Sequence, residues 1–382
     1  MREAKKGYIE VAFNGSLAGI PLDAQFRLPA KGVTAIFGPP GCGKTALARC
    51  IAGVQRLSNG FCAIDGEIWQ DERTFRPHLL RRAAYVFQLP ILPSHLSVRR
   101  TLLYYASSEP TLIDFHGVVE LLDLAPLLER LPSHLSAAQR QRLALGSALI
   151  GQPRLLLMDD PLFVLDRSAK CEILPFLERM RETLQLPMIY ISDDIADIER
   201  FADRLVMMKD GAVIAAGSLN DIQSDPVLAG RGEAAVCLDT VVGGYDGRYG
   251  LTMLRLKTAR LLIPGVPLRP GSQLRLRIAA SDVSIASEPP RASSILNAVP
   301  ARIKASLPYD EAHVTLVLAI EAGCSGVPLL ARITRRSFDT LQLGDGANVF
   351  AEIARAVPLG TPSGCLQGPP HQHENVRQPM SR

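Results

Sequence analysis

Strand-like apolar runs alternate with helix-like segments through the first part of the chain. Val33–Phe37 and Leu155–Met158 are short, almost wholly apolar runs, and helical patterns begin at Ala46 and at Leu135. This alternation is typical of strands that are connected through helices. It predicts an α/β domain with a mainly parallel sheet over residues 1–230.

The pattern changes after Gly232. Residues 234–357 contain short β-type runs that Gly, Pro and Asp residues separate. These runs are Leu251–Leu256, Gln273–Ile278, His313–Ile320 and Asn348–Ile353. They predict a small all-β domain with an OB-like, barrel-like fold.

The β region contains a weak internal repeat. Tyr245-Asp246 followed by Leu251–Leu256 resembles Tyr309-Asp310 followed by Thr315–Ile320. Two related β modules packed as one unit would give this pattern, and so would convergent strand composition.

Residues 358–382 are rich in Gly, Pro, Gln and His and show no periodicity. This composition predicts a disordered tail. His371 and His373 offer a pair of metal-binding side chains, but the composition favours a solvated tail.

Composition and charge narrow the class of protein. The chain has 382 residues, 47% of them hydrophobic, with a net charge of +4 from scattered basic residues, so we expect a solvated surface and no nucleic-acid partner. Its apolar runs are too short to span a bilayer, and its N-terminal segment lacks the apolar core of a signal peptide. The seven cysteines contain no C-x-x-C pair, which indicates reduced thiols without a metal site. We expect a cytoplasmic protein that is able to dock on a membrane protein.

Residues 38–45 read GPPGCGKT, a full match to the phosphate-binding loop G-x-x-x-x-G-K-[S/T]. Glycines let such a loop curl so that its N–H groups face one anion, and the following helix adds the positive end of its dipole. Lys44 is expected to reach the β- and γ-phosphates, and the Thr45 hydroxyl to ligate Mg²⁺. The expected nucleotide-binding residues are Gly38, Pro39, Pro40, Gly41, Cys42, Gly43, Lys44 and Thr45. The loop predicts a nucleoside triphosphate site, and the thiol of Cys42 suggests a hypothesis that oxidation disturbs binding.

Four further segments accompany the phosphate loop. Tyr85–Gln88 is a short strand that ends in an amide, and Leu135–Gln139 opens a helix. Leu155–Asp159 is a buried strand that ends in a carboxylate, where Mg²⁺ needs an acceptor, and Phe163–Asp166 follows it at once. This set and its order resemble the ATP-binding subunit of an ABC transporter, across residues 1–230.

The β region points to a particular group of ABC ATPases. Residues 277–302 are very similar to the start of the regulatory domain, of the TOBE/Mop type, in molybdate-importing ABC ATPases. Phe87–Leu103 is also similar to that family. The resemblance therefore covers nearly the whole chain apart from the tail.

The resemblance implies roles for the residues that match the family. Gln88 would touch Mg²⁺ and the attacking water, and Asp159 would accept the Mg²⁺ ion. Asp166 would communicate across a dimer interface. Phe13 has two interpretations, as a ring that stacks on adenine or as a core aromatic.

Three positions depart from the family pattern. In the signature Ser136–Gln139, which closes over the γ-phosphate of the opposite protomer, Ala137 and Ala138 replace two glycines, and their Cβ atoms would crowd a loop that needs close approach. Asp160 replaces the catalytic glutamate with a carboxylate one methylene shorter. Asp193 stands where the family has a histidine that contacts γ-phosphate, so an anion faces an anion. The ATP-holding groups are intact, and we therefore expect normal ATP affinity with turnover lowered roughly tenfold or more.

The leading hypothesis is that the chain is the energy-coupling subunit of an oxyanion importer, with molybdate as the first candidate and tungstate and sulfate left open. The resemblance implies ATP and Mg²⁺ as cofactors and a homodimer that holds two ATP molecules between its protomers. It also implies two membrane-spanning permease subunits, an external oxyanion-binding protein, and a location at the cytoplasmic face of the inner membrane.

The β domain is expected to sense cytoplasmic oxyanion and to restrain transport. Ser293, Ser294 and Asn297 offer hydroxyl and amide donors for a tetrahedral dianion, and Lys304 offers a positive charge. An equally weighted alternative is that Ser294 and Asn297 only end a strand or a turn.

Two alternative functions remain open from the sequence. The chain would be an ATP-binding regulator that hardly hydrolyses ATP, or the degenerate half of a heterodimer with an intact sister chain. The three departures favour the first alternative. The importer-like segment Phe87–Leu103 argues against it, because a solitary switch has no use for a membrane-coupling surface.

Overall fold

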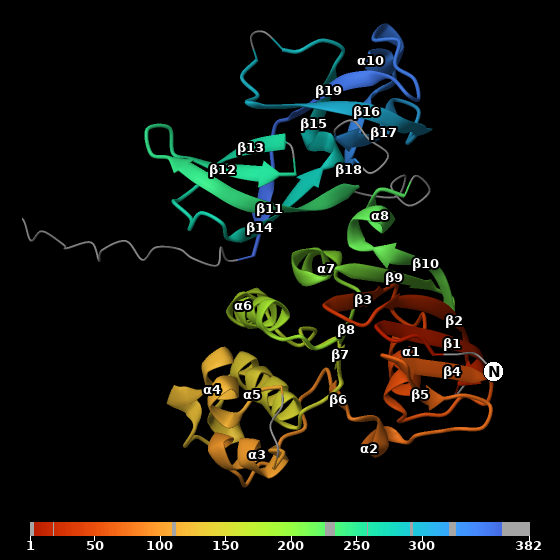
Figure 1. Ribbon diagram of the computed structural model, residues 1–382, viewed down its shortest axis with the longest axis vertical. Coiled ribbons are helices and arrows are strands. Elements are labelled where there is room, and N and C mark those ends of the chain that lie inside the picture. The colour runs from red at the N-terminus through yellow and green to blue at the C-terminus, as the bar shows by residue number, and fades with distance from the viewer. Residues whose placement is uncertain are drawn as a thin grey trace, which may run out of the picture.

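The computed structural model describes residues 4–17, 19–108, 112–225, 234–257, 259–290, 293–320 and 326–360. An α/β unit forms one end of the molecule and an all-β unit forms the other (Figure 1). The predicted fold class, an α/β unit followed by a small all-β unit, is therefore confirmed.

One ten-stranded sheet runs through the α/β unit in the order β5-β4-β1-β2-β10-β9-β3-β8-β7-β6. Its strands are β1 Tyr8–Leu17, β2 Ile20–Pro29, β3 Val33–Phe37, β4 Gly60–Ile64, β5 Glu67–Gln70, β6 Ala83–Val86, β7 Leu155–Asp159, β8 Met188–Ser192, β9 Arg204–Lys209 and β10 Ala212–Ser218. Strands β9, β3, β8, β7 and β6 pair in parallel, whereas β2, β1, β4 and β5 form an antiparallel arm. The prediction of a mainly parallel sheet holds for the half that carries the phosphate loop, and the antiparallel arm was not predicted.

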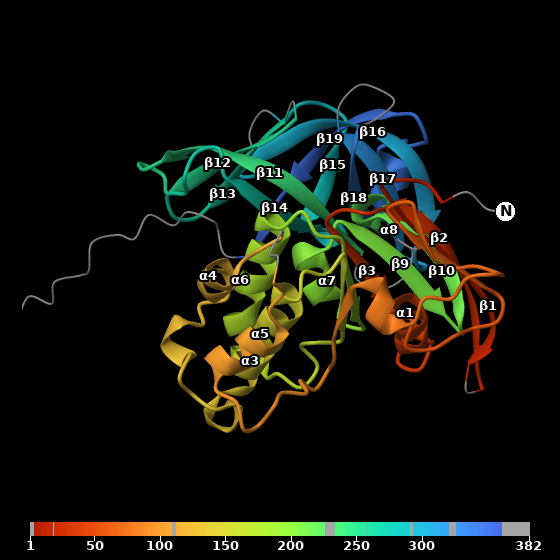
Figure 2. The ribbon, with the colours of Figure 1, turned by 60° about the horizontal axis from the view of Figure 1, so that its bottom comes forward.

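Helices cover both faces of the parallel half. The described α-helices of the α/β unit are α1 Lys44–Ala52, α2 His78–Arg81, α3 Val98–Tyr105, α4 Phe115–Leu121, α5 Ala137–Ile150, α6 Arg167–Thr183, α7 Ile195–Phe201 and α8 Leu219–Gln223, and α10 Arg335–Thr340 lies in the all-β unit. Alternate side chains of a strand face opposite sides of a sheet. Val33 and Ala35 of β3 accordingly pack in one cluster with Leu143 of α5, and Ile36 packs in a second cluster with Leu47 of α1. Figure 2 shows α1 and α5 on either side of β3.

The all-β unit contains two five-stranded antiparallel sheets, in the orders β13-β12-β11-β14-β20 and β15-β19-β16-β17-β18. Their strands are β11 Ala235–Asp246, β12 Leu251–Leu256, β13 Ala259–Pro264, β14 Gln273–Ala279, β15 Val283–Ala286, β16 Asn297–Pro308, β17 His313–Ile320, β18 Val327–Thr334, β19 Asn348–Ile353 and β20 Val357–Leu359. The four β-type runs predicted from the sequence are the strands β12, β14, β17 and β19. Inward-facing residues of both sheets form a single apolar core.

The two β sheets repeat one arrangement. Strands β11 to β14 have the same order in the first sheet as β16 to β19 in the second, and β15 and β20 each join the other sheet. Asp246 Oδ1 accepts hydrogen bonds from the backbone N–H groups of Arg248 and Tyr249 after β11, and Asp310 Oδ1 accepts from those of Ala312 and His313 after β16. The shared order and the shared turn support a duplicated module over convergent composition.

The ordered structure extends past the predicted end of the β region. Strand β20 pairs with β14, so that Pro358 and Leu359 belong to the first sheet rather than to the tail. The rest of the predicted tail, residues 361–382 with His371 and His373, lies outside the described residues, as does the predicted boundary around Gly232.

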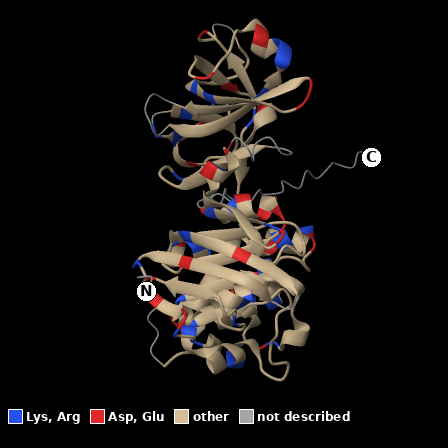
Figure 3. Cartoon of the chain, turned by 90° about the vertical axis from the view of Figure 1, so that its right-hand side faces the viewer, with Lys and Arg blue, Asp and Glu red and all other residues tan. Residues whose placement is uncertain are grey.

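The distribution of charge on the surface and the character of the helices are those expected from the composition. On the side shown in Figure 3, basic and acidic residues are interspersed over both units. Within the part of the chain that the structure describes, no helix has both the length and the apolar character needed to cross a membrane.

A buried arginine holds the far end of the helix that follows the phosphate loop. Arg81 is 1% exposed and donates to the carbonyl oxygens of Cys50 at 2.8 Å and Ile51 at 2.7 Å, in the last turn of α1. The guanidinium also lies over the rings of Trp69 and Phe75. The carbonyl end of a helix is partially negative, so this cation stabilises α1 where the loop does not reach.

We predict that Arg81→Ala destabilises the protein by about 3 kcal/mol, because it removes charged hydrogen bonds and leaves buried carbonyl groups without donors. Urea unfolding followed by circular dichroism measures this effect. The exposed Arg73→Ala variant is the matched control and should change the free energy of unfolding by less than about 0.5 kcal/mol. Equal effects of the two variants would contradict the role given to Arg81.

Candidate nucleotide-binding site

The phosphate loop connects β3 to α1 at the carboxyl end of the parallel strands. Gly41 and Gly43 have φ angles of 80° and 97°, in the left-handed region that glycine adopts without strain. A Cβ atom on Gly38 would lie 2.3 Å from the backbone oxygen of Met208, so a larger residue does not fit there. The glycines thus give the loop the tight curl that anion binding requires.

The Lys44 side chain lies across this loop. Its Nζ donates to the carbonyl oxygens of Gly38 at 2.7 Å and Pro39 at 3.1 Å. A positive charge therefore stands where the sequence predicts phosphate. Cys42 is buried, and burial raises the pKa of its thiol. Because oxidation proceeds through the thiolate, this environment argues against the hypothesis of a redox-sensitive loop.

Thr45 and Asp159 meet at the end of β7. Thr45 Oγ1 donates to Asp159 Oδ1 at 3.1 Å, and the Tyr85 hydroxyl donates to Asp159 Oδ2 at 2.6 Å. Asp159 is 8% exposed. A hydroxyl and a carboxylate side by side supply the oxygen ligands that Mg²⁺ prefers, so these residues fit the predicted metal. The contact from Tyr85 was not predicted, because the sequence does not show which strand lies beside β7.

Gln88 leaves the sheet at the same edge. It follows β6 by two residues, and β6 pairs in parallel with β7, with Val86 opposite Met158. The carboxyl ends of the two strands therefore lie together, and Gln88 starts from the edge that carries Asp159.

The structure brings together the carboxylates of the altered site. Asp160 has a left-handed φ of 49°, a conformation that aspartate tolerates better than most residues. Burial, followed by the negative charges of Asp193 and Asp159, raises the pKa of Asp160 to about 6. Lys44 and Lys170 act in the opposite direction. The carboxylates of Asp159, Asp160 and Asp193 therefore lie close enough to interact, whereas the expected contact of Asp193 with the γ-phosphate stays a prediction.

Lys170 holds the segment that carries Asp193. Its Nζ donates to Asp194 Oδ2 at 3.0 Å and to Asp197 Oδ2 at 2.9 Å, from α6 to α7. Asp194 is also the N-cap of α7, and its backbone N–H donates to Ser192 Oγ at 3.0 Å. Asp193 is exposed between these fixed neighbours. Lys170 is a further residue of the site that was not predicted, because no motif contains it.

The altered signature forms an ordinary helix start. Ser136 Oγ accepts from the Gln139 N–H at 3.1 Å, and Gln139 Oε1 accepts from the Ser136 N–H at 3.0 Å, which is a capping box. Ala137 and Ala138 form the first turn of α5, and the side chain of Ala138 is buried. The expected need for glycine at these two positions is therefore wrong for this structure. Both residues lie in right-handed helix, where alanine is more favourable than glycine.

Two other predicted residues have clear positions. Asp166 is the N-cap of α6, where its Oδ1 accepts from the Ala169 N–H at 2.8 Å. Phe13 is 1% exposed and belongs to the apolar core between the arm and α1. Its interpretation as an adenine-stacking ring is therefore wrong in this structure, because a buried ring has no free face. Ile20, which the sequence did not indicate, lies beside the loop, since a Cβ atom on Gly43 would be 3.6 Å from its Cγ2.

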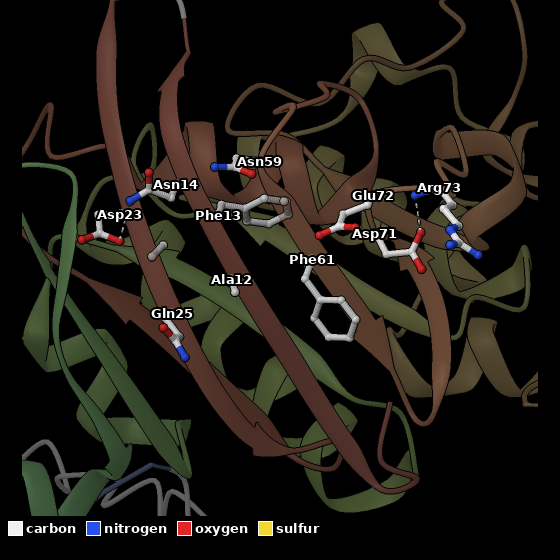
Figure 4. A pocket seen from close by; sticks show the side chains of 12 residues that line it. Ala12, Phe13, Asn14, Asp23, Gln25, Asn59, Phe61, Asp71, Glu72 and Arg73 are labelled. Carbon is white, nitrogen blue, oxygen red and sulfur yellow. Dashed lines mark hydrogen bonds between the residues drawn. The ribbon is translucent and has the colours of Figure 1, made fainter. Parts of the chain in front are cut away.

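A hollow of about 630 Å³ lies on the outer face of the antiparallel arm. Figure 4 shows Asn14, Asp23 and Phe61 along it, with Asp71 and Glu72 at one side. Three carboxylates without a phosphate loop do not suit a triphosphate. This hollow is therefore separate from the nucleotide site.

A second hollow, which we call the β6–α5 groove, has a volume of about 540 Å³ and lies between β6 with its following loop and the helices α3 and α5. Its lining includes Tyr85, Phe87, Ile91, Tyr105 and Ala148. Phe87 is 40% exposed and Ile91 is 78% exposed. The groove is apolar and open, and Phe87, Pro90, Ile91 and Leu92 of its lining belong to the segment Phe87–Leu103 that resembles importer ATPases.

The residues predicted to bind an oxyanion have mixed positions in the all-β unit. Asn297 Oδ1 accepts from the Leu262 N–H at 2.7 Å, and its Nδ2 donates to the Leu262 carbonyl at 2.9 Å. Its amide therefore joins β16 to β13, which fits the structural interpretation. Ser293, Ser294 and Lys304 are exposed.

Strand β14 of the all-β unit forms hydrogen bonds to α7 of the α/β unit. Arg277 Nε donates to Glu199 Oε2 at 2.8 Å, and Arg275 donates to the Ala202 carbonyl at 2.7 Å and to Asp239 Oδ1 at 2.7 Å. Glu199 is buried, and burial raises its pKa although Arg277 opposes that change. The helix that follows Asp193 is thus held by both units.

The amino-acid sequence of this chain is similar to those of known ATP-binding proteins. A family model described as ABC transporter matches residues 22–163, and one described as TOBE domain matches residues 293–356. A Bradyrhizobium diazoefficiens protein named molybdenum import ATP-binding protein ModC 1 is 80% identical over 92% of this chain and 95% of its own length. Proteins of Rhodopseudomonas palustris and Rhodobacter capsulatus named molybdenum import ATP-binding protein ModC are 51% and 42% identical, over 92% and 93% of this chain and 96% and 99% of their own. The chain therefore belongs to the ABC transporter family, as one of its ATP-binding chains with a TOBE domain.

Proposed function

We propose that this chain is the ATP-binding, energy-coupling subunit of an oxyanion importer, with molybdate as the transported ion. The observation that carries the proposal is the similarity, over nearly the whole chain, to proteins named for molybdenum import. The arrangement of Lys44, Thr45 and Asp159 supports it, because a transport ATPase must first bind a nucleoside triphosphate. We take residues 1–230 as the ATPase domain and residues 234–357, with the remainder of β20, as the regulatory domain.

Different residues of the site have separate roles in the hydrolysis of ATP. The N–H groups of the phosphate loop and Lys44 bind the β- and γ-phosphates of ATP. Thr45 and Asp159 would hold Mg²⁺, which when bound would neutralise charge on the phosphates. Asp160 and Gln88 orient the water that attacks the γ-phosphorus, and ADP and inorganic phosphate leave.

We propose a homodimer with two ATP molecules at its interface. The capping box of Ser136 starts the 14-residue helix α5, and the positive end of such a helix attracts phosphate. In the dimer, this end would face the γ-phosphate bound to the other copy. Asp166, at the start of α6, would lie at the same interface.

The β6–α5 groove is the surface we assign to the membrane-spanning partner. Exposed apolar side chains that line a groove mark an interaction site, and an amphipathic helix is the common occupant of such a groove. Each of two permease subunits would place a cytoplasmic helix in the groove of one protomer. That arrangement holds the chain at the cytoplasmic face of the membrane, and an external oxyanion-binding protein would reach it only through the permease.

The first test measures ATP turnover by the chain assembled with its membrane subunits in lipid. We expect turnover well above that of a Lys44→Ala variant, because Lys44 supplies the charge at the phosphates, and we expect further stimulation by a molybdate-loaded binding protein. Nucleotide binding with turnover no higher than that of Lys44→Ala would contradict the proposal and identify an ATP-binding regulator.

The three departures from the family pattern should lower turnover to different extents. We propose that the pair Asp160 and Asp193 accounts for a roughly tenfold loss, because the Asp193 carboxylate repels the γ-phosphate and Asp160, one methylene shorter than glutamate, misplaces the water. The variant Asp160→Glu with Asp193→His should therefore raise kcat about tenfold with unchanged ATP affinity. The variant Ala137→Gly with Ala138→Gly is the control, and it should not raise kcat, because α5 begins without strain. No gain in the first variant, or an equal gain in the second, would show that this assignment is wrong.

We propose that the regulatory domain senses oxyanion through Ser293, Ser294 and Lys304, and restrains turnover through α7. The support is the path of contacts from Arg277 to Glu199 on α7, and from α7 through Asp197 and Asp194 to the segment of Asp193. A shift of β14 against α7 would change the position of Asp193 at the γ-phosphate.

Molybdate inhibition of ATP turnover tests this path. In the assembled transporter, Arg277→Gln should raise the molybdate concentration for half inhibition at least tenfold, while molybdate binding measured by calorimetry on the full chain stays unchanged. The exposed Arg255→Gln of β12 is the matched control and should behave like the native protein. Absence of binding heat in the native chain would remove the sensor role, and unchanged inhibition in Arg277→Gln would remove α7 as its route.

A further inference from the structure

We propose that Tyr85 is a positioning residue that ties the metal-binding carboxylate of Asp159 to the β6–α5 groove. The identity of the molecule that fills this groove rests on the proposed function. The connection itself rests on contacts within this chain, at the two ends of one side chain.

The hydroxyl end of Tyr85 fixes the carboxylate. Tyr85 Oη donates to Asp159 Oδ2 at 2.6 Å, while Thr45 Oγ1 donates to Oδ1 at 3.1 Å. Both oxygens of Asp159 are therefore engaged, and the plane of the carboxylate is set by two donors from different elements. Partners of this kind orient a metal ligand, and their loss typically costs about 10- to 100-fold in metal affinity or activity.

The strand register explains how Tyr85 reaches this carboxylate. Strands β6 and β7 pair in parallel, with Tyr85 opposite Leu157. Asp159 is therefore two residues further along β7, on the same face of the sheet as Leu157. A phenol ring is long enough to cover that distance, and its hydroxyl reaches the carboxylate and donates to Asp159 Oδ2.

The ring end of Tyr85 belongs to the groove. The rings of Tyr85 and Phe87 are 4.7 Å apart between centroids at an interplanar angle of 44°, which is a packed aromatic pair. Tyr85 and Phe87 are both lining residues of the groove, together with Tyr105 of α3 and Ala148 of α5, and Phe87 is 40% exposed there. An occupant that presses on Phe87 therefore presses on Tyr85 as well.

The hydroxyl and the ring of Tyr85 belong to one rigid side chain, so a movement of one end moves the other. A tilt of the Tyr85 ring moves its hydroxyl, and a hydrogen bond of 2.6 Å does not survive a displacement of about 1 Å. The carboxylate then rotates or loses its donor. Occupation of the groove would thus be felt at the metal ligand through a single side chain.

Manganese binding to the full chain, read by electron paramagnetic resonance with ATP present, tests the positioning role without requiring turnover. We expect Tyr85→Phe to weaken Mn²⁺ binding about tenfold while ATP affinity in EDTA stays within twofold of native. Tyr105→Phe removes a hydroxyl from the same groove and should leave both quantities unchanged. Native Mn²⁺ affinity in Tyr85→Phe, or an equal loss in Tyr105→Phe, would overturn the proposal.

A double-mutant cycle tests the connection to the groove. Phe87→Ala removes the ring that packs on Tyr85, and we expect it to weaken Mn²⁺ binding at least threefold in the native background. In the Tyr85→Phe background the same change should have no effect, because the hydroxyl that transmits it is absent. Additive effects, or no effect in the native background, would overturn the connection. Both measurements use the isolated chain, so they remain decisive even if the chain proves not to serve an importer.

Discussion

The parallel pairing of β3, β8, β7 and β6 is the constraint on which the rest of the site depends. Parallel strands end at the same edge of a sheet, and here that edge receives Gly38, Asp193, Asp159 and Gln88 from four distant parts of the chain. In the proposed function, the phosphate loop binds the anion, and the neighbouring strands supply the metal ligand and the groups that would face the γ-phosphate. Ligand sites at the carboxyl edge of such sheets follow from this topology.

The same edge collects negative charge. Asp159, Asp160 and Asp193 lie close enough to raise the pKa of Asp160, and Lys44 and Lys170 oppose them. This balance favours a site that holds a metal-bound triphosphate, because the cation offsets the carboxylates when ATP arrives. If Asp193 takes the place of a histidine donor as we propose, the same balance disfavours a fast reaction at the γ-phosphate.

Helix α7 connects this edge to the second unit of the protein. Buried Glu199 and the carbonyl of Ala202 accept hydrogen bonds from arginines of β14. Lys170 donates to Asp194 and Asp197 at the acidic start of α7. Breaking one partner of a buried ion pair is costly, so α7 and β14 should move together rather than separately. Tyr85 connects the same edge to the β6–α5 groove. In our proposals, Asp159 and the segment of Asp193 are therefore the two places where contacts from outside the site would reach the nucleotide.

The phosphate loop, the α/β and all-β classes and four β strands could be predicted from the amino-acid sequence, because glycine spacing and apolar periodicity are local properties. The burial of Phe13, the unstrained helix start at Ala137 and the link that Asn297 makes between two strands became clear from the fold. So did the contact of Tyr85 with Asp159. These facts depend on which strands and helices become neighbours, and that choice is made by packing across the whole chain rather than by any segment alone.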